Sequence, residues 1–175
     1  MDCFHGKKYH CFTDNWPDLN LVEICSQWME SKEEISCVLG PSLLLGLVRW
    51  TILHPLTEHK GKSASEDTTF AQLHLSILEA LAETQKIMNP QKKFPAVTNK
   101  SVVLLISRVE ERLKSYDSQC DLGSNKELSL DRLGQFVHCL TATGGIQGKL
   151  NEVMSSVKRI MNDNRLLQMY ISRNS

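Results

Sequence analysis

The spacing of apolar residues constrains this chain more than any other feature of its sequence. The clearest example is the stretch ELSLDRLGQFVHCL, residues 127–140, where apolar residues recur at steps of three and four. They are Leu130, Leu133, Val137 and Leu140. Such steps place side chains on one face of an α-helix. Ser129 precedes the repeat and is expected to cap this helix, with Asp131 in the first turn, where the helix dipole favours an anion.

The same spacing predicts further helices along the chain. They cover residues 17–29, 40–55, 70–88, 101–116, 150–161 and 164–172. Val102 and Val103 favour a strand locally, but the longer pattern from Val102 to Leu113 is helical. We therefore predict an all-α fold of about six or seven helices arranged as antiparallel hairpins, with no strand. A solenoid-like stack would also fit, although the sequence has no clear internal repeat.

The polar stretches suggest how these helices are organised into a domain. Residues 1–16 have no apolar period and are expected to form a loose N-terminal segment. Residues 17–175 are expected to form a single all-helical domain. Within it, the polar stretch at about 56–68 is expected to be a flexible loop.

Composition argues against two kinds of partner. Lys plus Arg equals Asp plus Glu at 20 each, so the chain lacks the basic excess of a nucleic-acid-binding domain. The longest apolar run, Leu43–Val48, is far shorter than the ~20 residues that span a bilayer. No signal peptide is visible, so we expect an intracellular chain with free thiols at its six cysteines. They are Cys3, Cys11, Cys25, Cys37, Cys120 and Cys139.

Two short patterns resemble ligand-binding motifs, and neither is complete. Gly61-Lys62-Ser63 matches the end of a phosphate-binding loop, but Leu56 occupies the position of the required glycine. The stretch GGIQGKL fails in the same way. Four soft metal ligands gather near the start of the chain. They are Cys3, His5, His10 and Cys11. Two of them are adjacent in sequence and suit one tetrahedral ion poorly, so a disordered terminus is the better interpretation.

Other polar residues on predicted helices have structural explanations. His74 and His138 are expected to be packed or surface histidines rather than general bases. Arg49 lies within an apolar helix, where it must pair or reach solvent. The sequence therefore predicts no enzyme activity, no metal and no cofactor.

Four segments, taken in order, resemble a known family. They are LGLVRW, AQLHLSILEAL, ELSLDRLGQ and NRLLQMYIS, and LVEICSQWMES precedes them. Together they resemble the C-terminal half of the Integrator complex subunit 15 family over about residues 18–172. A longer N-terminal helical part of the family has no counterpart here, and the stretch between Cys37 and Gly40 looks shortened. The resemblance thus allows a truncated form, an isoform or a divergent copy.

The resemblance implies a non-catalytic, nuclear scaffold subunit of the Integrator complex, which acts in small nuclear RNA 3′-end processing and attenuates RNA polymerase II transcription. It implies contact with other Integrator subunits, notably the module of subunits 10, 13 and 14, without direct binding to nucleic acid or membrane. A generic helical adaptor outside Integrator remains the alternative. An enzyme with a site assembled from scattered residues is a third class, which a deep pocket with convergent polar groups would favour.

Two structural expectations concern the later helices. Leu133 and Val137 are expected to be buried against the helix at 150–161, because the break at Gly144-Gly145 would let the two helices fold back as a hairpin. The last helix crowds apolar residues into a short segment and is the candidate partner surface. Its residues are Leu166, Leu167, Tyr170 and Ile171. The alternative is that it caps the preceding hairpin.

Overall fold

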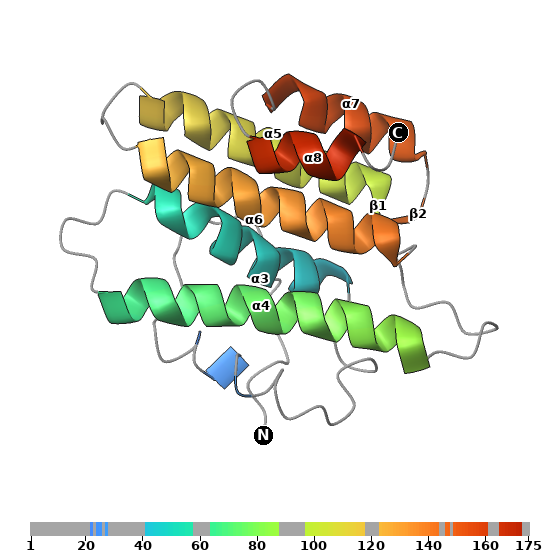
Figure 1. Ribbon diagram of the computed structural model, residues 1–175, viewed down its shortest axis with the longest axis horizontal. Coiled ribbons are helices and arrows are strands. Elements are labelled where there is room, and N and C mark those ends of the chain that lie inside the picture. Colours follow the sequence, from blue (N-terminus) through green and yellow to red (C-terminus); the bar gives the residue numbers. More distant parts are fainter. Residues whose placement is uncertain are drawn as a thin grey trace, which may run out of the picture.

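The structure is a computed structural model, and it confirms the all-α prediction. It describes residues 22, 24, 25, 27, 41–57, 64–87, 97–117, 123–143, 146–147, 149–160 and 165–172. Nearly all of these residues are helical (Figure 1). The helices are α3 (Pro41–Leu53), the 3₁₀ turn η1 (His54–Leu56), α4 (Ala64–Ile87), α5 (Asn99–Asp117), α6 (Gly123–Ala142), α7 (Leu150–Ile160) and α8 (Arg165–Ser172). No described helix is both long and apolar enough to cross a membrane.

Two helices begin earlier than their apolar spacing predicts. Helix α4 starts at Ala64, inside the stretch expected to be a loop, and Leu56 at the start of that stretch is buried. In the sequence, Ser63 and Glu66 have the spacing of a capping box, a pattern that favours a helix start among polar residues. Helix α6 starts at Gly123, so the expectation that Ser129 caps it is wrong. A helix start made of polar residues has no periodic apolar residues, so apolar spacing does not reveal it.

A short parallel strand pair is the exception to the prediction of no strand. Strand β1 (Val97–Thr98) pairs with β2 (Ile146–Gln147), with Val97 opposite Ile146. Each strand leads into a helix, β1 into α5 and β2 into α7. Because the strands run parallel, α5 and α7 start at the same end of the molecule (Figure 1).

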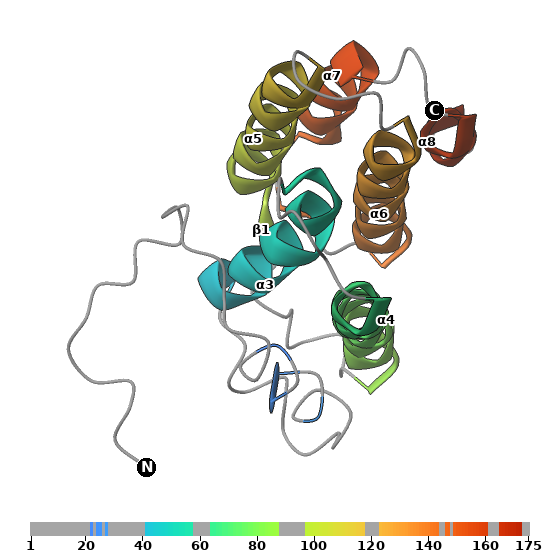
Figure 2. The same cartoon turned by 90° about the vertical axis from the view of Figure 1, so that its left-hand side faces the viewer.

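Helix α7 therefore lies along α5 in the same direction. The Asn99 side-chain amide donates to Glu152 near the start of both helices. Closer to their ends, Arg159 of α7 lies 4.0 Å from Glu110 of α5. The prediction that α6 and α7 pack together as a hairpin is thus wrong. Because β1 pairs with β2, α7 packs against α5, and the helix that packs along α6 is α8 (Figure 2). Leu133 and Val137 are nevertheless buried, as predicted.

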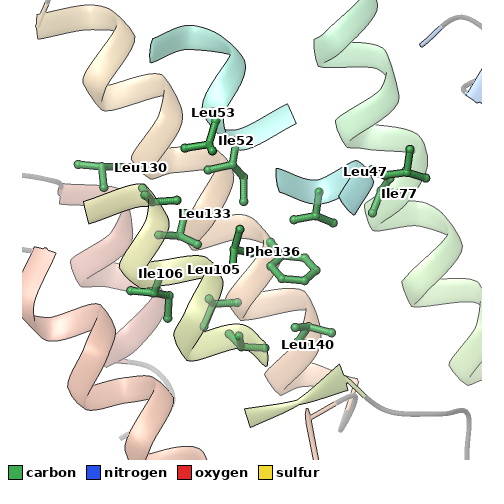
Figure 3. Packing of buried hydrophobic residues seen from close by; sticks show 14 of the residues in the cluster. Leu47, Ile52, Leu53, Ile77, Leu105, Ile106, Leu130, Leu133, Phe136 and Leu140 are labelled. Atoms are coloured by element: carbon green, nitrogen blue, oxygen red, sulfur yellow. The ribbon is translucent and has the colours of Figure 1, made fainter. Parts of the chain in front are cut away.

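Helix α6 lies at the centre of the fold. It packs against α3, η1, α4 and α8 (Figure 2). Buried side chains of α3 to α7 form one apolar cluster, part of which is shown in Figure 3. Phe136 is the largest of its fully buried members. Burying a side chain of this kind contributes roughly 1.5 to 3 kcal/mol.

The segment before α3 also reaches this core. Val22 has no exposed surface, and Cys25 packs against the apolar cluster. Both have helical backbone, in agreement with the helix predicted over 17–29. The remainder of that predicted helix and the expected loose segment at 1–16 lie outside the described residues.

Candidate functional site

The end of helix α3 creates a local problem that the rest of the fold solves. In an α-helix each N–H donates to the carbonyl four residues back, so Thr51 would accept from residue 55. Residue 55 is proline, which has no N–H, and the chain tightens into η1 at this point. The last carbonyls of α3 therefore need donors from outside the helix.

Helix α6 supplies these donors from two side chains. Nη1 of Arg132 donates to the Thr51 carbonyl oxygen at 2.6 Å. Oγ of Ser129, one turn earlier, donates to the Ile52 carbonyl oxygen at 2.7 Å. A guanidinium is also well placed here because a helix C-terminus carries partial negative charge. The two bonds fix the end of α3 against α6.

Helix α4 joins the same place through His74. Nδ1 of His74 lies 3.1 Å from Oγ1 of Thr51 on α3, and Nε2 lies 3.1 Å from Oε1 of Gln135 on α6. The ring is only 2% exposed. We call these five residues the polar junction. They are Thr51, His74, Ser129, Arg132 and Gln135.

Burial controls the charges in the polar junction. Loss of solvation, reinforced by the positive charge of Arg132, lowers the pKa of His74 to about 4. The ring is therefore neutral at neutral pH, with its proton on Nε2 facing Gln135 and with Nδ1 accepting from Thr51. Burial also lowers the pKa of Arg132 to about 10, against the opposing effect of Asp67, so Arg132 remains a cation. The junction holds one charge.

A second contact ties η1 to the start of α4. The imidazole of His54 stacks on Phe70, with ring centroids 3.8 Å apart and an interplanar angle of 14°. Nδ1 of His54 lies 3.6 Å from the partly exposed carboxylate of Asp67. Oγ1 of Thr57 donates to the His54 carbonyl oxygen at 2.7 Å and ends the turn. Aromatic stacking therefore continues the α3–α4 interface beyond the polar junction.

The polar junction positions helices rather than presenting a reactive group. Both ring nitrogens of His74 are engaged and the ring has almost no solvent contact, which agrees with its interpretation as a packed histidine. The described residues contain no group of three His, Cys, Asp or Glu side chains that could hold a metal ion. The cysteine-histidine cluster at residues 3–11 and the Gly61-Lys62-Ser63 motif lie outside the described residues.

The thiols within the described part of the chain behave as small apolar groups. Cys25 and Cys139 are half-buried and free. Burial raises the pKa of both thiols. Sγ of Cys139 lies 3.7 Å from the Leu78 carbonyl oxygen on α4, so it helps to pack α6 on α4. Both residues thus behave as small apolar side chains in the packing.

Sequence reasoning missed most of the polar junction, although a signal for it exists. Pro55 follows Thr51 by four residues and so marks a carbonyl without an intrahelical donor. On α6, Ser129, Arg132 and Gln135 recur every three residues beside the apolar stripe. A polar stripe at that spacing next to a buried face indicates side chains that bond inward.

The candidate partner surface on α8 lies at the edge of what the structure describes. The side chains of Leu166, Leu167, Tyr170 and Ile171 are outside the described part. The α8 residues that are described are exposed, for example Met169 at 51%. Helix α8 packs along α6.

The polar junction is built from the segments that carry the family resemblance. LGLVRW leads directly into Thr51, AQLHLSILEAL contains His74, and ELSLDRLGQ contains the three α6 members. A sequence model of one family, Integrator complex subunit 15, matches residues 7–161. The chain belongs to the Integrator complex subunit 15 family. The polar junction is thus a feature of a member of this family, and it lies inside the matched region.

A curated relative agrees with the family assignment. Integrator complex subunit 15 of Danio rerio is similar to this chain, at 26% identity over 171 residues. The match covers 89% of this chain and 36% of the zebrafish protein. This member of the Integrator complex subunit 15 family therefore spans about a third of the length of that relative.

Proposed function

We propose that this chain is a non-catalytic scaffold subunit of the Integrator complex. The observation that carries the proposal is the family match, which extends over residues 7–161 and so takes in α3 to α7. On this proposal the chain acts in the nucleus and supports small nuclear RNA 3′-end processing and attenuation of RNA polymerase II transcription. Its partners are other Integrator subunits, in particular the module of subunits 10, 13 and 14.

The described architecture suits a scaffold. The polar groups of the junction bond inward and hold three helices in fixed relative positions. Large apolar side chains are exposed on four different helices and on the segment before them. They are Ile24, Leu75, Leu104, Leu128 and Met169. A rigid helical body that exposes apolar side chains on several elements can contact more than one partner.

Affinity purification tests this proposal directly. The tagged full chain is recovered from nuclear extract and its companions are identified by mass spectrometry. We expect enrichment of Integrator subunits, with subunits 10, 13 and 14 foremost, over a tagged helical protein of similar size. Recovery of none of these subunits contradicts the scaffold assignment and favours the alternative, a helical adaptor outside Integrator.

A further inference from the structure

Among the described elements, helix α4 is held mainly by two helices, with a further contact to η1 through His54 and Phe70. It packs against α3 and α6, which lie between it and the pair formed by α5 and α7 (Figure 2). The α5–α7 pair has its own links, including the β1–β2 pairing and the bond from Asn99 to Glu152. The contacts of α4 are therefore separable from those that hold α5 and α7 together.

One side chain bonds α4 to both of its neighbours. His74 contacts Thr51 of α3 through Nδ1 and Gln135 of α6 through Nε2, both at 3.1 Å. In the neutral ring, Nδ1 accepts from the Thr51 hydroxyl group. The Thr51 hydroxyl group also donates to the Val48 carbonyl oxygen at 2.9 Å, so its hydrogen is shared between the two acceptors. Both bonds of the ring lie in the interface, out of contact with solvent.

Protonation of the ring would place a second cation in this dry interface. The charge that acts on His74 from α6 is Arg132, which is 5% exposed and already positive. On α4 itself, Asp67 precedes His74 by about two turns, and its carboxylate is 57% exposed and so largely solvated. Thr51, the α3 residue that contacts the ring, is uncharged. Two buried like charges with little compensation favour a state in which His74 reaches water.

We propose that α4 is an acid-releasable helix: protonation of His74 detaches α4 from α3 and α6 while the α5–α7 pair stays folded. The release is local because His74 lies on α4 and both of its bonds cross the interface between α4 and its neighbours. Acid thus exposes the apolar face of α4, which includes Leu73 and Ile77, together with the surface of α3 and α6 that it covered. This property is independent of the proposed role in the Integrator complex.

Hydrogen exchange of the full chain tests the proposal. Exchange rates are corrected for the intrinsic effect of pH and compared between pH 7 and pH 5. Linkage between a ring pKa of about 4 in the closed state and about 6.5 in the open state predicts a roughly twenty-fold loss of protection for α4. Protection of α5 is expected to hold. Equal loss in α4 and α5 would overturn the local release.

Two variants assign the effect to one ring. His74→Gln cannot titrate, so its α4 protection is expected to be independent of pH over this range. His138→Gln, a change of the same kind on α6, should retain the twenty-fold effect seen in the original chain. A pH-dependent loss that survives in His74→Gln contradicts the proposal. If that variant does not fold, NMR titration of His74 in the unaltered chain decides, and a pKa above about 6 overturns the proposal.

Discussion

At the scale of single residues, the proline after helix α3 explains a buried arginine. Arg132 is 5% exposed and donates to the Thr51 carbonyl oxygen, which Pro55 leaves without an intrahelical donor. A buried guanidinium would otherwise be costly to maintain. Its role here is to satisfy a carbonyl that the local sequence cannot satisfy.

This explanation predicts coupling between Arg132 and Pro55. Arg132→Met leaves the Thr51 carbonyl oxygen unpaired and should lower the free energy of unfolding by roughly 1.5 to 3 kcal/mol, as for a hydrogen bond from a charged group. In a Pro55→Ala background the new N–H can reach the Thr51 oxygen, so the same change should cost less. Urea unfolding of the four proteins measures the coupling energy, expected at about 1 kcal/mol.

Ser129 provides the matched control for that cycle. Its hydroxyl group donates to the Ile52 carbonyl oxygen, and the residue four positions after Ile52 is Leu56, which has an N–H, rather than the proline. Ser129→Ala should therefore cost the same free energy in the original chain and in the Pro55→Ala background. Equal costs for Arg132→Met in the two backgrounds would contradict the proline explanation.

Gly46 gives a second prediction at this scale. It lies within α3, and a Cβ atom added there would have no heavy atom within 4 Å. Glycine inside a helix costs about 0.5 to 1 kcal/mol relative to alanine because its unfolded state has more conformational freedom. We expect Gly46→Ala to raise the free energy of unfolding by about that amount, measured by urea denaturation. A loss of stability would instead show that the backbone at Gly46 needs a conformation that alanine resists.

At the scale of elements, helix α6 has the largest role in the packing. It is flanked by α3, η1, α4 and α8, and its residue Leu133 has no exposed surface. Leu133→Ala should lower the free energy of unfolding by about 2 to 5 kcal/mol, because it removes buried methyl groups and leaves a cavity. Leu128→Ala on the same helix is the control, since Leu128 is 42% exposed and should change stability by no more than about 0.5 kcal/mol. Equal effects of the two changes in urea unfolding would refute the central role of Leu133.

At the scale of the whole molecule, α8 connects the fold to the proposed function. Because α8 packs along α6, we expect Leu167→Glu to lower the melting temperature of the chain. Met169→Glu is the control, since Met169 is 51% exposed, and it should leave the melting temperature unchanged. Thermal unfolding is followed by circular dichroism, and capture of Integrator subunits is measured for both variants. If Leu167→Glu instead abolishes capture while the melting temperature holds, Leu167 belongs to a partner surface.

The positions of the helices could be predicted from local sequence. Apolar residues at steps of three and four show a helix wherever one face is buried, as in the stretch 127–140, because this pattern depends only on neighbouring residues. The pattern did not detect the polar first turns of α4 and α6, because those turns bury few apolar side chains. The helical position of Cys139, beside the apolar residues of the stretch 127–140, follows from the same local spacing.

The pairing of the helices and the bonds of the polar side chains became visible only in the folded molecule. Helix α7 lies along α5 because β2 pairs with β1, two strands far apart in sequence that are too short to show an alternating pattern. The donor for the Thr51 carbonyl oxygen comes from Arg132, 81 residues later. Local spacing assigns a residue to a helix face, but the element that covers that face depends on contacts between distant parts of the chain. The polar junction therefore emerges only when α3, α4 and α6 are packed together.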